Sequence, residues 1–207
     1  MRFLLATAAL AAAWTASAQG TFEAIVSHAN PTPVFEPVDR ATVGWTFQPT
    51  NFIEVTDLGC FDYLFAPLPP ETVIQVGLWT SGGSLLGSSF IATSSALTNE
   101  SRYVSITPVT LDPSQTYHVG AYFPGGLLSV EACGGGVGGS VFMGTSLLLR
   151  GAARNNDRDG FGFPPGIPNT GGGAYLAPNF RYRDGIPEPS SWLLLGLGGL
   201  FLAARRK

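Results

Sequence analysis

The chain has 207 residues, of which 45% are hydrophobic and only 12% are charged, and its formal net charge is −3. So small a charged fraction argues against a coiled coil, a charged disordered chain or a helical bundle, and the slight acidity provides no basic surface for nucleic acid. The apolar residues are spread mostly in short runs, which excludes a membrane protein with many spans. The length predicts one domain with additional segments.

The first 18 residues have the pattern of a secretory signal peptide. Arg2 precedes an apolar run rich in Ala and Leu, and the small residues Ala16-Ser17-Ala18 end the pattern. The apolar run is too short to cross a membrane comfortably, and no basic stop follows it. We therefore predict export, cleavage between Ala18 and Gln19, and an N-terminal extended segment over residues 19–40.

The body, residues 41–185, has the alternation typical of half-buried strands. The clearest runs are 42–47, 73–79, 102–107 and 116–123, and shorter candidates are 52–57, 88–92, 140–143, 147–150 and 180–183. The turn at residues 80–84 contains two glycines and predicts a hairpin. Since no window of the body has a convincing helical period, we predict an all-β fold: an antiparallel β-sandwich of jelly-roll or immunoglobulin-like type.

Two tryptophans of the body fall on different faces of their strands. Trp45 shares a face with Val43 and Phe47, which predicts a place in the core. Trp79 lies opposite the apolar face of its strand and beside Gly77, so it is the better candidate for an exposed platform that contacts a sugar ring. The alternative for Trp79 is also a place in the core, where most aromatic residues of a sandwich lie.

The chain has two cysteines, Cys60 and Cys133. Export would take both to an oxidising compartment, where an even number of cysteines favours a disulfide. A bridge closing so long a loop would stabilise the fold by ~4 kcal/mol in the chain-entropy model. We predict this disulfide, with two buried free thiols as the alternative.

The stretch at residues 155–160 resembles a calcium loop in part. Asn155, Asp157 and Asp159 place oxygen atoms at alternate positions, and Gly160 follows. The twelfth position of such a loop requires a bidentate Glu, but Gly166 stands there. A charged surface turn is therefore the better interpretation, calcium is the alternative, and we expect no resident metal or cofactor.

Residues that could support catalysis are few. The two histidines, His28 and His118, lie in a Pro-rich segment and in a predicted strand, and no nucleophile or metalloprotease motif occurs. Glu54, Asp57 and Asp62 could pair as the carboxylates of a glycoside hydrolase, but nothing in the sequence fixes their separation. We expect that the protein is not an enzyme.

The C-terminal residues have three parts in a fixed order. These are Pro187-Glu188-Pro189, the thirteen uncharged residues 192–204, and Arg205-Arg206-Lys207. A helix of thirteen residues spans about 20 Å at ~1.5 Å per residue, which is less than the ~30 Å hydrocarbon core. Basic residues stay cytoplasmic, so we predict a short, weakly held transmembrane helix with the body outside.

This three-part order closely resembles the PEP-CTERM sorting signal of Gram-negative bacteria, here over residues 186–207. The resemblance implies recognition by an exosortase near Pro187, Glu188 and Pro189, and transient insertion in the inner membrane. It also implies a mature form at the cell surface or outside the cell, in association with exopolysaccharide and biofilm systems.

The body resembles a recurrent extracellular β-domain of unknown function. The resemblance rests on Gly44-Trp45-Thr46-Phe47, Val76-Gly77-Leu78-Trp79, the run 102–111 and the closing motif Pro178-Asn179-Phe180, and Cys60 departs from it. It implies a fold class and no catalytic residues.

Together these features predict an exported surface or extracellular-matrix protein with a structural or adhesive role. Its partners would be exosortase and, as a further candidate, exopolysaccharide, with no nucleic acid. The alternative is a carbohydrate-binding module that uses Trp79, and a glycan hydrolase is the least favoured.

Overall fold

The computed structural model describes nine stretches of the chain: 20–29, 36–37, 40–62, 73–123, 129–130, 132–133, 140–155, 160–166 and 174–185. Its regular elements there are strands, with no helix among the described residues. Every strand pair among the described residues is antiparallel. The all-β, antiparallel fold predicted from alternation is therefore confirmed.

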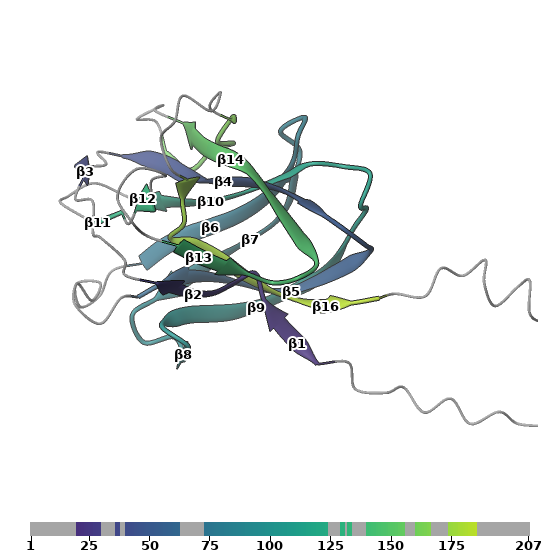
Figure 1. Ribbon diagram of the computed structural model, residues 1–207. Helices are drawn as coiled ribbons and strands as arrows, with labels where there is room; N and C mark the ends of the chain where they lie inside the picture. The colour runs from purple at the N-terminus through teal and green to yellow at the C-terminus, as the bar shows by residue number, and fades with distance from the viewer. Residues whose placement is uncertain are drawn as a thin grey trace, which may run out of the picture.

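Two five-stranded sheets form the body (Figure 1). The first has the order β1 (Thr21–Glu23), β16 (Pro178–Asp184), β5 (Ile53–Phe61), β9 (Ser101–Leu111) and β8 (Leu97–Thr98). The second has the order β14 (Leu147–Asn155), β4 (Ala41–Pro49), β10 (Tyr117–Phe123), β6 (Val73–Thr80) and β7 (Leu85–Ala92).

Three two-stranded pairs accompany these sheets. They are β11 (Ser129–Val130) with β3 (Glu36–Pro37), β12 (Ala132–Cys133) with β15 (Ala174–Tyr175), and β13 (Ser140–Met143) with β2 (Ile25–Ala29). The hairpin predicted at residues 80–84 joins β6 to β7, and Gly83 takes the positive φ of 86° that the turn requires.

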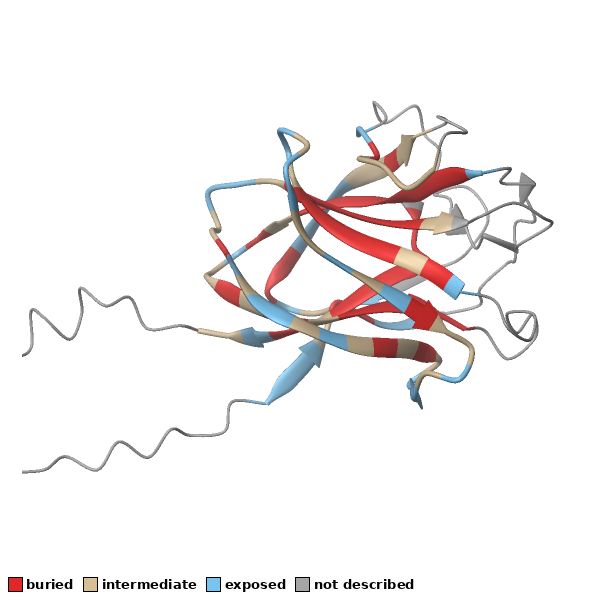
Figure 2. Cartoon of the chain, turned by 180° about the vertical axis from the view of Figure 1, so that it is seen from behind, coloured by how far each residue is buried: buried red, intermediate tan, exposed pale blue. Residues whose placement is uncertain are grey.

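The core lies between the two large sheets, whose strands carry most of the buried residues (Figure 2). The inward face predicted for β4 is confirmed, because Val43, Trp45 and Phe47 are all fully buried. The Trp45 ring stacks on Phe180 of the other sheet at 5.7 Å, and its Nε1–H donates to the carbonyl oxygen of Pro178 at 2.8 Å. Burial of each such ring stabilises the fold by about 1.5–3 kcal/mol, and the hydrogen bond fixes how the sheets face each other.

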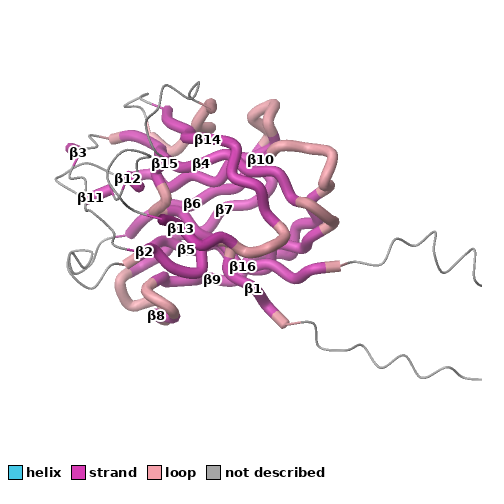
Figure 3. The backbone as a smooth tube through the Cα atoms, in the orientation of Figure 1, coloured by secondary structure: helices cyan, strands magenta, loops and turns pink. Residues whose placement is uncertain are grey.

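The segment 19–40, predicted to precede the sandwich, in fact contributes strands to it. Thr21 of β1 pairs with Arg183 of β16, so the first strand begins beside the end of the last strand of the first sheet (Figure 3). Ala24 and Ile25 are buried in the core. The N-terminal boundary of the folded domain therefore lies near residue 21 rather than 41.

Asn179 holds this N-terminal segment in place. Its side chain is buried, its Oδ1 accepts a hydrogen bond from the Ile25 N–H at 3.0 Å, and its Nδ2 donates to the Ile25 carbonyl oxygen at 3.0 Å. The same Nδ2 also donates to Tyr103 Oη at 2.8 Å and to Ser101 Oγ at 3.2 Å. One amide thus joins β2, β9 and β16, which gives a structural reason for the closing motif Pro178-Asn179-Phe180.

The outer face of the second sheet is covered by residues 160–166. The Phe161 ring lies 5.1 Å from the Trp79 ring, and the Phe163 ring lies 4.8 Å from the His118 ring. Trp79 is only 2% exposed, so the prediction that it forms an exposed platform is wrong. Glycines make the cover possible: a Cβ at Gly120 would lie 2.8 Å from Pro164 Cγ, and one at Gly77 would lie 2.5 Å from Phe161 Cζ.

Candidate functional site

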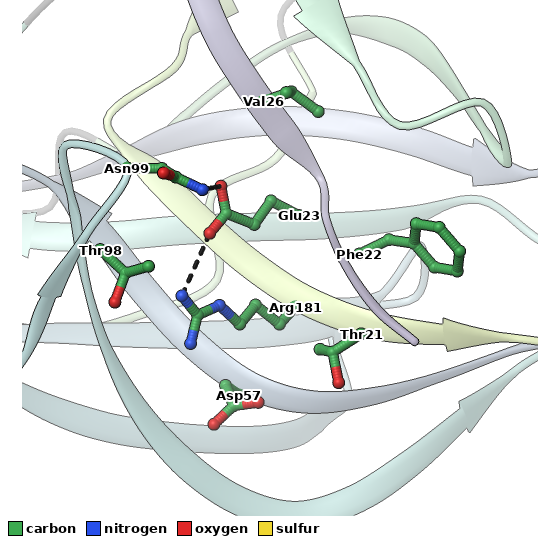
Figure 4. Close-up of a pocket in the computed structure, with 8 residues that line it drawn as sticks. All are labelled: Thr21, Phe22, Glu23, Val26, Asp57, Thr98, Asn99 and Arg181. Carbon is green, nitrogen blue, oxygen red and sulfur yellow. Dashed lines mark hydrogen bonds and ion pairs between the residues drawn. The ribbon is translucent and has the colours of Figure 1, made fainter. Parts of the chain in front are cut away.

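A cavity of 460 Å³ opens at the β1 side of the first sheet (Figure 4). Six of its eight lining residues are polar or charged, and apolar atoms still make up about half of the lining surface. The lining residues are Thr21, Phe22, Glu23, Val26, Asp57, Thr98, Asn99 and Arg181. Four of them come from the N-terminal segment, and the others come from β5, β8, the β8–β9 turn and β16.

Three charged residues of the cavity form a row across neighbouring strands. Arg181 of β16 is in register with Glu23 of β1 on one side and with Asp57 of β5 on the other. Figure 4 shows the Arg181 side chain between the two carboxylates. Cross-strand neighbours of opposite charge stabilise a sheet by roughly 0.2–1 kcal/mol per pair, so the row is favourable as well as polar.

A bulge in β5 brings Asp57 into this row. The register of β5 shifts between Val55 and Asp57 against β9, and the β16 register shifts at the same place. Against β16, where Arg181 pairs with Asp57 and Tyr182 pairs with Val55, Thr56 is the extra residue. The Thr56 hydroxyl donates to Asp57 Oδ2 at 2.7 Å. Bulges re-aim side chains and are frequent beside functional sites. Here the bulge leaves Asp57 on the outer face, where Ser105 Oγ donates to its Oδ1 at 2.7 Å.

The Arg181 guanidinium is fixed by two further contacts. Its Cζ lies 3.9 Å from the centre of the Tyr103 ring, and its Nη2 donates to Glu23 Oε1 at 3.1 Å. Burial and the nearby Glu23 carboxylate raise the pKa of Tyr103, so its phenol stays neutral. A neutral ring beneath a partly buried guanidinium adds a cation–π attraction of about 0.5–2 kcal/mol. The charge is therefore held in one position.

Glu23 is fixed by the turn between β8 and β9. Asn99 Nδ2 donates to Glu23 Oε2 at 3.3 Å, while the other carboxylate oxygen accepts from Arg181. Asn99 and Glu100 have positive φ values of 45° and 64°, the left-handed conformation of a tight hairpin turn. Asn tolerates this conformation well and Glu less well, so the turn carries some strain beside the cavity.

Several predicted site residues lie elsewhere in the structure. His118 is buried beneath Phe163, with its Nδ1 2.9 Å from the Pro164 carbonyl oxygen. Glu54 pairs with Arg183 at 3.7 Å, and Asp62 pairs with Arg102. The three acids proposed for glycan hydrolysis thus have different partners: Asp57 accepts from two hydroxyls, and the other two pair with arginines.

The predicted disulfide is not formed in the structure. Cys60 is a free thiol, 1% exposed, on the inward face of β5, and burial raises its pKa to about 12. The side chain of Cys133, in β12, lies outside the described part of the structure. A neutral, buried thiol is a poor nucleophile, so Cys60 has a packing role here.

The calcium candidate is described only in part. Asn155 ends β14, whereas Asp157 and Asp159 lie outside the described residues. Among the residues that the structure describes, no group of three or more His, Cys, Asp or Glu side chains is placed to hold a metal ion.

The processing sites also lie outside the described residues. These are Ala18, Gln19, Pro187, Glu188, Pro189 and the predicted span 192–204. Within the part of the chain that is described, no helix is both long and apolar enough to cross a membrane. Comparison with known families therefore decides the nature of the C-terminal segment.

Residues 185–207 match the family model of the PEP-CTERM protein-sorting motif. The chain carries a PEP-CTERM sorting motif. This motif marks an exported protein that exosortase recognises. No curated protein and no solved structure matches the chain, so the PEP-CTERM match speaks for the C-terminal segment and leaves the function of the β-domain open.

The PEP-CTERM match begins where the folded domain ends. β16 ends at Asp184, and the N–H of Gly185 donates to the carbonyl oxygen of Phe52 at 3.2 Å. Gly185 has a positive φ of 69°, which turns the backbone out of the strand direction. Only Gly185 and Ile186 therefore separate the last strand from Pro187.

Sequence reasoning missed the charged row beside the cavity. The sequence indicates Asp57 as a candidate acid, whereas Glu23, Asn99 and Arg181 belong to no motif. The alternation of β16 places Arg181 on the outer face, and this was the one available signal. Its neighbours depend on the pairing of the first strand with the last, which alternation does not reveal.

Proposed function

We propose that the protein is an exosortase-processed component of the cell surface or extracellular matrix, with a structural or adhesive role linked to exopolysaccharide. The PEP-CTERM motif at residues 185–207 is the observation that carries this proposal. The protein acts without catalysis. The buried Cys60 thiol and the acids engaged by arginines or hydroxyls support a non-enzymatic role, because an activated nucleophile or acid needs a matched partner and access to substrate.

Processing near the motif takes place close to the folded body. Since two residues separate β16 from Pro187, an enzyme in the membrane must work directly beneath the domain. The pairing of Thr21 with Arg183 places the start of β1 at the same end. The start of β1 and the end of β16 therefore lie at one end of the domain, and the precursor that we propose is attached through its C-terminal signal to the inner membrane of a Gram-negative cell.

The strand order favours an immunoglobulin-like sandwich over a jelly roll. In the immunoglobulin arrangement, strand B lies beside E, and strand C lies between C′ and F. The strands β5, β6, β7, β9 and β10 occupy the positions of B, C, C′, E and F, since β5 pairs with β9 and β6 lies between β7 and β10. β16 and β4 then fill the flanking positions of A and G.

The second candidate function is carbohydrate binding. Trp79 no longer supports it, because its ring is covered by Phe161. The polar cavity beside Arg181 supports it instead.

The sorting proposal is tested by localisation in cells with and without exosortase. One variant lacks residues 187–207, and a second carries Pro187→Ala and Pro189→Ala, which leave the apolar and basic parts intact. We expect the deletion to abolish surface retention and the double substitution to leave uncut precursor in the inner membrane. Unchanged surface retention of the deletion variant in cells that contain exosortase would contradict the proposal.

A further inference from the structure

We propose that the cavity beside Arg181 binds a non-acidic saccharide unit of a polymer. We also propose that the N-terminal strand β1 forms one side of this site, so that the site is complete only when β1 is paired with β16. The inference deepens the carbohydrate-binding candidate and is independent of the sorting route. It rests on four properties of the cavity: its polar groups, the balance of its charges, the rigidity of its side chains, and the N-terminal segment that supplies half of its lining.

The size and polarity of the cavity suit a sugar. Its volume of 460 Å³ lies within the range of small-molecule sites, about 300–1,000 Å³. Carboxylate, guanidinium, amide and hydroxyl groups line it beside apolar atoms. A sugar presents both kinds of surface, because its hydroxyls exchange hydrogen bonds with such polar groups and its C–H faces pack on apolar atoms. The Thr21 and Thr98 hydroxyls lie on either side of Arg181 in Figure 4, so donors and acceptors surround the guanidinium.

The charges of the row select against an acidic ligand. Two carboxylates, Glu23 and Asp57, lie beside a single guanidinium, Arg181. A ligand carboxylate or phosphate would approach both acids, and like charges brought together in an interface are unfavourable. Neutral and amino-bearing sugars avoid this repulsion, so the proposed class excludes uronic acids and phosphorylated sugars.

The polar groups are held in place before a ligand arrives. Arg181 rests on the Tyr103 ring at 3.9 Å and bonds Glu23 at 3.1 Å, and Glu23 is in turn held by Asn99. Asp57 is held by the hydroxyls of Thr56 and Ser105. Groups that are already ordered lose little side-chain entropy on binding, which favours a binding site over a flexible charged surface.

The site depends on the first residues of the folded chain. Thr21, Phe22, Glu23 and Val26 supply half of the lining, and Asn179 ties the intervening Ile25 to β16 through both of its backbone polar groups. Only Gln19 and Gly20 separate Thr21 from the predicted signal cleavage. The cavity is complete only when this segment has docked onto β16.

The test uses the mature protein purified from its cells and an array of neutral, amino-bearing and acidic oligosaccharides as the probe. Arg181→Gln removes the central charge, and Arg183→Gln is the matched control, since it lies on the same face of β16, half exposed, and pairs with Glu54 instead. We expect retention of neutral or amino-bearing glycans. Arg181→Gln should weaken that retention at least about tenfold, because hydrogen bonds to charged groups have this strength, whereas Arg183→Gln should leave it within about twofold.

A milder variant guards against a folding defect. If thermal unfolding shows that Arg181→Gln does not fold, Asp57→Asn carries the test and should weaken retention in the same way. Its amide has the shape of the carboxylate: the oxygen accepts from one of the Thr56 and Ser105 hydroxyls, and the other hydroxyl can turn to accept from the NH2 group. Retention of no glycan, preference for acidic glycans, or equal loss in the Arg181 and Arg183 variants would overturn the inference. Localisation is measured separately, so failure of glycan binding leaves the sorting proposal standing, and the reverse also holds.

Discussion

The replacement Asn179→Ala tests how the N-terminal segment is held to the fold. Asn179 is 1% exposed, and its Oδ1 accepts from the N–H groups of Ile25 and Phe180 at 3.0 and 2.8 Å. Its Nδ2 donates to the Ile25 carbonyl oxygen. Alanine leaves these three backbone groups without the side chain that bonds them.

The expected loss of stability follows from those groups. A buried polar group without a partner costs about 1–3 kcal/mol. A water molecule can enter the space vacated by the amide and form some of the lost hydrogen bonds. We therefore expect the free energy of unfolding to fall by about 3–5 kcal/mol. That loss is a large share of the roughly 5–15 kcal/mol typical of a domain.

The measurement combines urea unfolding, followed by circular dichroism, with hydrogen exchange of residues 20–29. Undocking should accelerate exchange at Ile25 more than in β6 or β10. Asn51→Ala is the control, because Asn51 is half-buried at a turn and its side-chain hydrogen bonds with Thr50 and Asp184 are long, at 3.4 and 3.5 Å. The free energy of unfolding of this variant should change by less than about 0.5 kcal/mol. A loss below about 1 kcal/mol for Asn179→Ala, with exchange at Ile25 unaltered, would refute the reasoning.

Three further predictions concern other parts of the fold. Gly120→Ala should cost about 1–3 kcal/mol and shift the Trp79 fluorescence to the red, since its Cβ would lie 2.8 Å from Pro164 Cγ. Gly82→Ala, with its nearest atom at 3.8 Å, should leave both properties unchanged, and an equal effect would contradict the packing argument. Burial lowers the pKa of His118 below its ordinary value of 6.5, so the unfolded chain takes up the proton first as the pH falls. The free energy of unfolding should therefore decrease as the pH falls from 6.5 to that lowered pKa, and His118→Gln should remove this pH dependence. If the variant keeps the pH dependence of the wild type, His118 is not its source. In the absence of reductant, the Cys60 thiol should react with Ellman's reagent only once the protein is denatured. If no thiol reacts in the denatured protein, Cys60 is in a disulfide.

Alternation along single strands was sufficient for the fold class and for the inward faces. Val43, Trp45 and Phe47 share a face, and burial of that face follows from the two-residue period of a strand. The same period also places Trp79 correctly on the outer face of β6. It does not tell whether another segment covers that face, so the sequence predicted exposure where residues 160–166 lie. Gly77 and Gly120, which leave room for Phe161 and Pro164, were the available clue.

The charged row was beyond sequence reasoning for a different reason. Glu23 and Arg181 are 158 residues apart and meet only because the first strand pairs with the last. Asp57 joins them through a bulge at Thr56, which shifts the register of β5 against β16 by one residue. A one-residue shift reverses which side chains face outward, and alternation within one strand carries no information on its partner's register. The C-terminal motif was predictable because its three parts are contiguous in the sequence.

The most direct test of the account is the intact mass of the mature protein isolated from its own cells, with both termini sequenced by mass spectrometry. Removal of the signal peptide predicts a chain that begins at Gln19, and processing by exosortase predicts that this chain has lost Arg205, Arg206 and Lys207. A mature protein that still carries those three basic residues would contradict the account, because the C-terminal segment would then be a permanent anchor.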